Sequence, residues 1–133
     1  LQAAYNATDK IPILGTSITE YGVALGLDNF NGTVGSNVSG TSDLAPLTEQ
    51  ADALIELFPE AKNVGLLYCS AEPNSKYQVE VVKARLESKG VTVVEYSFSD
   101  ANDISAVLTS EPIIHNLPVI SAEPVLISIS PGV

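Results

Sequence analysis

The sequence has few basic residues, and this shortage limits the partners that it can bind. It contains 6 lysine and arginine residues against 16 aspartate and glutamate residues, which gives a net charge of −10 at pH 7. Nucleic acids and anionic membrane surfaces bind clustered basic side chains, so we expect neither as a partner. The acidic residues are spread along the chain, a pattern typical of a solvated acidic surface rather than of an acidic tail.

Cysteine, methionine and long hydrophobic runs are also scarce. Cys69 is the only cysteine, so no intramolecular disulfide can form and the redox compartment stays open. No apolar run reaches the roughly 18 residues of a membrane-spanning helix. The first ten residues, LQAAYNATDK, have neither the basic nor the apolar region of a signal peptide. Methionine is absent throughout, so we expect a mature product or an excised fragment.

Motifs for catalysis and cofactor binding are missing as well. The chain has no glycine-rich phosphate loop with its lysine, no G-x-G-x-x-G after a strand and no G-x-S-x-G elbow. No group of His, Cys and Asp has metal-ligand spacing, and we expect no cofactor. A nucleophilic pair of Cys69 and the single histidine, His115, stays open because such partners need only meet in space. The simpler interpretation is a mostly buried Cys69 at a strand end and a surface His115 between two prolines.

Hydrophobic periodicity predicts alternating strands and helices in the middle of the chain. The predicted elements are a short strand at 10–15, a helix at 47–58, a strand at 63–69, a helix at 75–89, a strand at 91–96 and a helix within 97–110. This order predicts an α/β fold, a parallel sheet flanked by helices with right-handed connections. The segment 16–22 is predicted as a polar loop, and 23–40 as loop with short extended pieces.

Particular residues support these assignments. The strand at 63–69 is expected to be buried on both faces, because its apolar run does not alternate. Ser75 or Asn74 is expected to cap the following helix, Gly90 to end it in a left-handed conformation, and Asp100 to cap the last helix. The expected apolar faces are Leu47, Ala51, Leu54, Ile55 and Phe58 on the first long helix, and Val79, Val82 and Leu86 on the second.

The C-terminal segment, residues 111–133, does not continue the alternation. The runs at 117–121 and 125–130 are typical of strands, but no helix lies between them. Parallel neighbours need a crossover of a dozen or more residues. We therefore expect that this part pairs antiparallel or that intervening chain is missing.

Two polar loops follow apolar strands and are the candidate ligand-binding segments. GTSITEYG follows KIPIL, and CSAEPNSKYQ follows VGLLY. In open α/β sheets, ligands bind outside the carboxyl ends of strands. Hydroxyl and amide side chains beside a helix N-terminus suit a carboxylate or another polar ligand group. The alternative interpretation is ordinary turn and capping chemistry, which uses the same residue types.

Several segments are specific in combination: KIPI leading into a T-x-x-T-[DE] loop, N-V-S-G-T-S-D, LFPEAKNVGLLY, PNSKYQVE and KGVTVVE. Together they resemble the substrate-binding proteins of bacterial ABC importers, in particular the group associated with tryptophan or tyrosine uptake. The resemblance covers about residues 10–108. It implies part of a type I periplasmic-binding-protein fold, in which two α/β lobes hold a ligand in the cleft between them. It also implies an ABC permease as the partner and an extracytoplasmic, membrane-anchored or periplasmic location.

The resemblance assigns residues 1–42 to the end of the first lobe and the crossover, 43–110 to an α/β unit of the second lobe, and 111–133 to C-terminal strands. The two polar loops are then expected to face each other across the cleft. Glu20 or Glu72 would pair with the ammonium group of an amino acid, and Ser75 with its carboxylate; the resemblance implies an aromatic amino acid. The full set of candidate contacts is Thr16, Ser17, Thr19, Glu20, Ser70, Glu72, Asn74, Ser75 and Gln78.

The chain also departs from the family. After Leu108 the family continues with a strand and a ligand-contacting turn, whereas LPVISAE and VLISIS look like later family segments joined early. The chain thus resembles a truncated or internally deleted member, in which half of the expected cleft is missing. Two alternatives to ligand binding remain. One is an interaction module whose exposed strands pair with another copy, and the other is a small hydrolase that uses Cys69.

Overall fold

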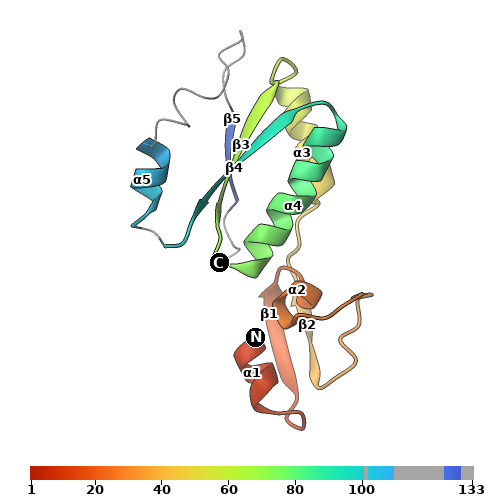
Figure 1. Ribbon diagram of the computed structural model, residues 1–133. Helices are drawn as coiled ribbons and strands as arrows, with labels where there is room; N and C mark the ends of the chain where they lie inside the picture. The colour runs from red at the N-terminus through yellow and green to blue at the C-terminus, as the bar shows by residue number, and fades with distance from the viewer. Residues whose placement is uncertain (101, 110–124, 130–133) are drawn as a thin grey trace. The chain divides into compact units, whose positions relative to one another are not determined.

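The computed structural model describes residues 1–100, 102–109 and 125–129, which fall into two compact units (Figure 1). The first unit is formed by residues 1–45 and the second begins at Pro46. In the described part of the chain, no helix combines the length and the hydropathy that crossing a membrane requires.

The first unit is a pair of parallel strands with two short helices. Its elements are α1 (Gln2–Ala7), β1 (Ile13–Ile18), α2 (Tyr21–Leu25) and β2 (Val38–Ser42). β1 pairs with β2 from Ile13 onward, directly after Pro12, which has no N–H to donate and is therefore tolerated before the first paired residue. The buried centre of this unit consists of Tyr21, Leu25 and Val38, with Leu1, Tyr5, Ile13, Ile18, Leu27, Phe30 and Val34 packed against it.

Helix α2 and the end of β1 correct the predicted loop at 16–22. β1 continues to Ile18 instead of ending at Gly15. α2 begins after Glu20, whose Oε2 accepts the N–H of Val23 at 2.6 Å, and it ends at Gly26, which has φ 66°. Glutamate is not among the residues that most often cap helices, so this start lacks the usual sequence signal. β2 begins within the segment 23–40, where short extended pieces were predicted, and continues beyond it to Ser42.

The second unit is a parallel sheet between helices. Its elements are α3 (Leu47–Leu57), β3 (Asn63–Cys69), α4 (Pro73–Ser88), β4 (Thr92–Phe98), α5 (Ile104–Thr109) and β5 (Val125–Ile129). The strand order is β4-β3-β5, and both pairings are parallel. α3 and α4 lie together on one side of this sheet and α5 lies on the other (Figure 1). The predicted α/β fold with a parallel, helix-flanked sheet is confirmed.

β5 decides one question that the sequence left open. It pairs parallel with β3, from Val64 opposite Val125 to Tyr68 opposite Ile129. The expectation of antiparallel pairing is therefore wrong for 125–129. The predicted strand at 117–121 lies outside the described residues, as does His115.

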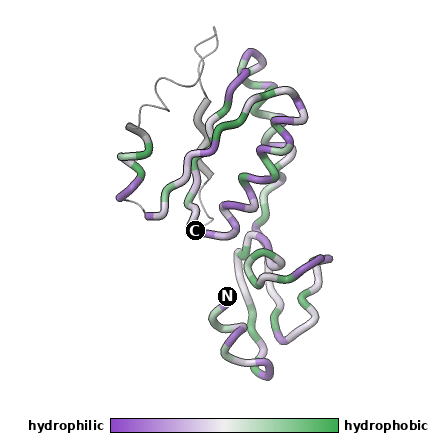
Figure 2. The backbone as a smooth tube through the Cα atoms, viewed as in Figure 1, coloured by the Kyte–Doolittle hydropathy of each residue, from purple (hydrophilic) through white to green (hydrophobic). Residues whose placement is uncertain are grey.

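The core of the second unit lies between β3 and α4. Every residue from Val64 to Tyr68 is buried, as its non-alternating apolar run predicts. α4 is largely hydrophilic along its length (Figure 2), but Val79, Val82 and Leu86 are at most 5% exposed and form its buried stripe. Gly90 follows the helix with φ 86°, the left-handed conformation that was predicted for it.

Three details at helix ends differ from the prediction. Phe58 lies beyond the last residue of α3 and is 48% exposed, so it is not part of the buried face. α4 begins at Pro73 and is capped by Glu72, not by Asn74 or Ser75. Asp100 caps a turn before α5, where its Oδ1 accepts the N–H of Asn102 at 2.6 Å.

Substitution of Leu86 tests the core of the second unit. Leu86→Ala is expected to lower the free energy of unfolding by about 2 to 5 kcal/mol, because it leaves a cavity at a fully buried position. Leu57→Ala is the matched control, since Leu57 is 73% exposed and its loss should cost less than about 0.5 kcal/mol. Urea denaturation of both variants measures the difference. Equal losses would contradict the assignment of Leu86 to the core.

Candidate functional site

The predicted ligand residues lie at two strand-to-helix junctions, one in each unit. In the first unit, Thr16 and Ser17 are exposed residues of β1, Thr19 is buried just after it, and Glu20 caps α2. In the second unit, Ser70 is exposed directly after β3 and Glu72 caps α4; Asn74 and Ser75 lie in the first turn of α4, and Gln78 lies in the next. Whether the two junctions face each other stays a prediction.

Burial distinguishes some of these residues from ordinary surface loops. In the part of the chain that the structure describes, the buried polar residues are Thr19, Asn74, Ser75 and Gln78, and all of them belong to the predicted set. Asn74, Ser75 and Gln78 are at spacings of three and four residues on α4, which places them on one helix face. Polar side chains are seldom buried without a hydrogen-bonding reason, so this face requires an explanation.

Two atoms on this face lack a partner. The Oδ1 atom of Asn74 and the Oγ atom of Ser75 are buried and make no hydrogen bond among the described residues. Leaving a buried polar atom unpaired costs about 1 to 3 kcal/mol. They sit at the N-terminus of a 16-residue helix, where the aligned peptide dipoles favour negative charge. The arrangement can therefore accept one hydrogen bond, donate one, and stabilise an anionic group.

Both glutamates of the candidate set already have a local role. The Oε2 atom of Glu20 accepts the N–H of Val23, and the Oε2 atom of Glu72 accepts the N–H of Ser75. Each carboxylate thus satisfies a backbone donor that the first turn of a helix leaves without a partner. Capping, the simpler interpretation of these residues, is what the structure shows. Pairing of either glutamate with a ligand ammonium group stays a prediction that depends on the second carboxylate oxygen.

The first junction contains an irregularity in β1. The pairing register with β2 shifts between Gly15 and Ile18, and Ser17 has φ 52°, a conformation unusual for a residue with a side chain. The N–H of Ser17 donates to the Oγ1 atom of Thr41 at 3.3 Å. The hydroxyl of Ser42 donates to the carbonyl oxygen of Thr19 at 2.8 Å. Side chains of β2 therefore hold the backbone of this junction.

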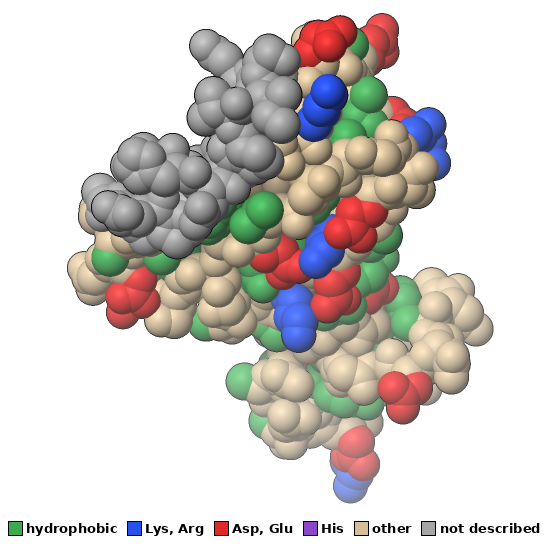
Figure 3. Space-filling view, turned by 45° about the horizontal axis from the view of Figure 1, so that its top comes forward, with side chains coloured by type: hydrophobic (Ala, Val, Ile, Leu, Met, Phe, Trp, Pro, Cys, Tyr) green, Lys and Arg blue, Asp and Glu red, His purple; other side chains and the backbone are tan. Residues whose placement is uncertain are grey.

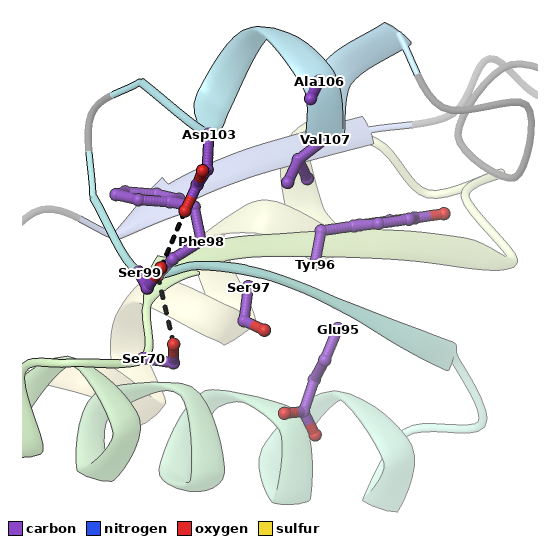
Figure 4. A pocket seen from close by; sticks show the side chains of 9 residues that line it. All are labelled: Ser70, Glu95, Tyr96, Ser97, Phe98, Ser99, Asp103, Ala106 and Val107. Carbon is purple, nitrogen blue, oxygen red and sulfur yellow. Dashed lines mark hydrogen bonds between the residues drawn. The ribbon is translucent and has the colours of Figure 1, made fainter.

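The second junction continues onto β4. No residue of β4 is among the predicted ligand contacts. Cys69 pairs with Phe98, so the ends of β3 and β4 meet, and both the N–H and the hydroxyl of Ser70 donate to the carbonyl oxygen of Phe98 at 2.8 and 3.1 Å. A hollow of about 620 Å³ opens beside this edge (Figure 4). Its lining includes Ser70, Tyr96, Phe98 and Asp103. These residues of β4 could have been predicted from the sequence, because neighbouring parallel strands end at the same edge of a sheet. That rule makes residues 97–99 neighbours of Ser70.

The hydrolase hypothesis gains no support from the surroundings of Cys69. Cys69 is half-buried as the last residue of β3, and its thiol lies 3.8 Å from the carbonyl oxygen of Ser99. The position at a strand end matches the simpler interpretation, although Cys69 is less buried than was expected. Within the described residues, no group of His, Cys, Asp and Glu side chains is arranged to hold a metal ion.

Ion pairs cover the outer surface of α4 without forming a basic patch on the face that Figure 3 shows. Lys83 lies 2.8 Å from Glu95, which also accepts the hydroxyl of Tyr68 at 3.1 Å. The bond from Lys83 lowers the pKa of Glu95, and burial, followed by the bond to Glu95, raises the pKa of Tyr68. Arg85 binds Asp52 through two bonds of 2.9 and 2.7 Å, which join α4 to α3. These contacts fix α4 on the unit rather than form a ligand site.

A family model described as ABC transporter substrate binding protein matches residues 1–121. The chain belongs to this family. A tyrosine-binding protein of Clostridioides difficile strain R20291 is 37% identical over 109 residues, which are 82% of this chain and 31% of that protein. The chain therefore spans about a third of the length of this relative. The family is one of substrate-binding proteins, as the resemblance in the sequence implied.

Three solved structures are also similar to this chain. An ABC domain of Streptococcus pneumoniae in complex with L-Trp has a TM-score of 0.72 and 35% identity, over 81% of this chain and 37% of that one. A conserved domain protein of Vibrio cholerae has a TM-score of 0.70 and 30% identity, over 80% and 36%. A ligand-free, open substrate-binding protein of Clostridium difficile with adhesive properties has a TM-score of 0.50 and 38% identity, over 81% and 36%.

Substitution of Glu72 tests the capping role. Glu72→Ala is expected to lower the free energy of unfolding by about 0.5 to 2 kcal/mol, because the N–H of Ser75 loses its acceptor. Glu80→Ala, at an exposed position of the same helix, is the control and should change it by less than about 0.5 kcal/mol. Thermal unfolding followed by circular dichroism compares them. A Glu72 variant as stable as the parent would show that the cap contributes nothing.

Proposed function

We propose that this chain is part of the solute-binding component of an ABC importer and binds an amino acid, with an aromatic one preferred. The proposal rests on two buried atoms at the start of α4, Asn74 Oδ1 and Ser75 Oγ, which have no hydrogen-bond partner among the described residues. A fold keeps such atoms at a cost to its stability, and a ligand that bonds to both would offset that cost. The proposal includes no catalytic step.

The two atoms suit different hydrogen-bond partners, an acceptor for the hydroxyl of Ser75 and a donor for the Oδ1 atom of Asn74. The hydroxyl of Ser75 can donate to a carboxylate, which the positive end of the α4 dipole also attracts. The Oδ1 atom of Asn74 can only accept, so it suits an ammonium group. An α-amino acid carries both groups on one carbon atom. This match favours a zwitterionic amino acid over a simple anion.

The other candidate residues complete the proposed site. Gln78 extends the polar face of α4 by one turn, and Ser70 and Glu72 border it from the preceding loop. Thr16, Ser17, Thr19 and Glu20 are the proposed contacts that the first unit contributes. In this proposal residues 1–42 belong to the first lobe and the crossover, 43–110 form the second-lobe unit, and 111–133 supply C-terminal strands.

The relatives support an aromatic ligand. One is named a tyrosine-binding protein, and one structure was solved with L-Trp. Tyr96 and Phe98 are among the residues that line the hollow, and their rings, which extend from β4 toward α5 (Figure 4), offer apolar surface for such a side chain. An ABC permease as partner and an extracytoplasmic location, with a lipid anchor or in the periplasm, follow from the same proposal.

Calorimetric titration of the chain with L-tryptophan and L-tyrosine tests the proposal. Asn74→Ala and Ser75→Ala are each expected to weaken binding about tenfold to a hundredfold, because each removes a hydrogen bond to a charged ligand group. Ser75→Ala should at the same time stabilise the unliganded chain by about 1 kcal/mol, because it removes a buried atom that has no partner. If Ser75 had only a structural role, its substitution would not weaken ligand binding while stabilising the unliganded chain.

Control measurements separate the proposed contacts from general effects. Lys76→Ala changes an exposed residue of the same helical turn and should leave the affinity unchanged. Tryptophan amide, which lacks the carboxylate, should lose the contribution of Ser75, and N-acetyltryptophan, which lacks the ammonium group, that of Asn74. Absence of binding to every amino acid tested would overturn the proposal.

A second candidate function is self-association through exposed strands. Ile11 and Leu14, before and within β1, are 66% and 78% exposed. Within the described residues no further strand pairs with the outer edges of β1 and β2. Size-exclusion chromatography separates the candidates. A dimer whose thermal stability does not respond to tryptophan or tyrosine favours association, whereas a monomer that these ligands stabilise favours binding.

A further inference from the structure

Tyr21 is a residue that the proposed contacts do not include, yet its hydroxyl lies inside the first junction. The side chain is 7% exposed and belongs to the buried centre of the first unit. Its hydroxyl donates to the carbonyl oxygen of Gly15 at 3.1 Å and reaches that of Thr41 at 3.4 Å. A hydroxyl has one proton, so this is a shared, three-centre bond.

The two carbonyl groups belong to the two paired strands and lie next to the irregularity in β1. Gly15 is in β1, immediately before Thr16, and Thr41 is in β2. The regular pairing of β1 with β2 runs to Gly15 opposite Gly40, and the register shifts before Ile18. The hydroxyl of Tyr21 therefore bridges the strands at the point where the ladder becomes irregular.

Two glycines make room for this hydroxyl. A Cβ atom at Gly15 would lie 2.7 Å from the hydroxyl oxygen, and one at Gly40 would clash with it. Gly40 also has φ 152°, and a Cβ atom there would clash with the carbonyl oxygen of Gly15. A side chain at either position would displace the phenol from its acceptors. Gly15, Tyr21 and Gly40 thus form one packing unit, which we call the Tyr21 clamp.

We propose that the Tyr21 clamp is a positioning device for the candidate ligand residues that follow Gly15. It fixes the backbone from which Thr16 and Ser17 project, and Tyr21 itself directly follows Glu20 in the chain. While the hydroxyl of Tyr21 bonds to both strands, Ser17 has φ 52° and its N–H donates to the Oγ1 atom of Thr41. This inference rests on the proposed function only for its effect on ligand affinity, because the effect on the backbone does not depend on a ligand.

The variant Tyr21→Phe removes the hydroxyl and keeps the ring in the core. Its first readout is amide hydrogen exchange of the full chain without ligand. The amides of Ser17 and Asp43, which donate to Thr41 Oγ1 and to the carbonyl oxygen of Ile18, should exchange about threefold to tenfold faster. Amides of β3 should exchange as in the parent, because β3 belongs to the other unit.

The matched control is Tyr5→Phe, which removes a hydroxyl from a residue packed on the same buried centre. It should leave the exchange of Ser17 and Asp43 unchanged. Equal exchange in the parent and in Tyr21→Phe would overturn the clamp. So would equal acceleration by both variants, because the effect would then come from a general loss of stability in the unit.

The second readout is the Kd for L-tryptophan and L-tyrosine at a temperature at which both variants are folded. Tyr21→Phe should raise the Kd about threefold to tenfold, and Tyr5→Phe should not. A stability loss alone does not change the affinity of the folded protein. If the parent binds and Tyr21→Phe binds equally well, the positioning role is wrong although the proposed function stands. If the parent does not bind, the proposed function fails and hydrogen exchange alone decides the clamp.

Discussion

Burial of β3 on both faces is the constraint on which the second unit depends. Its central residues, Val64 to Tyr68, are all buried, so α4 covers one face and the neighbouring strands β4 and β5 pair with the backbone on both edges. Since β3 runs parallel to β4 and β5, all three end at one edge of the sheet. The chain that leaves β3 at that edge is the candidate site.

The same geometry explains why the start of α4 can hold unpaired polar groups. Val79, Val82 and Leu86 anchor the helix to the sheet, and Lys83 and Arg85 tie its outer side to Glu95 and Asp52. These contacts hold α4 against the sheet with Asn74 and Ser75 at its buried start. Burying these two polar atoms without partners destabilises the fold, and the packing of the rest of the helix offsets this loss. Such a local loss of stability is expected at a ligand site.

Much of this architecture could be predicted from the sequence, because long apolar patterns determine it. The unbroken run VGLLY and the stripe of Val79, Val82 and Leu86 each allow one arrangement, and the glycine at position 90 marks the helix end. Helix starts were harder to predict. Glu20 and Glu72 cap α2 and α4, although serine, threonine, aspartate and asparagine are the usual caps, and so Asn74 and Ser75 were assigned a task that Glu72 performs.

The residues of both junctions could be named from the sequence, but their burial and their hydrogen bonds could not be predicted from it. The rule for strand ends identified both junctions, yet it gave no reason to separate buried Ser75 from exposed Ser70 or to expect that Tyr21 reaches Gly15 and Thr41. Those facts depend on three-dimensional packing between residues that have no periodic relation. β5 illustrates the same limit, because its parallel place beside β3 depends on pairing partners about 60 residues apart in the sequence.

Binding of an amino acid at the buried polar face of α4 can be measured directly by titrating the isotope-labelled chain with L-tryptophan and following backbone and side-chain NMR signals. We expect the largest shift changes at the amides of Asn74 and Ser75 and at the side-chain amide groups of Asn74 and Gln78. Shift changes confined to other parts of the chain, or none at saturating tryptophan and tyrosine, would contradict it.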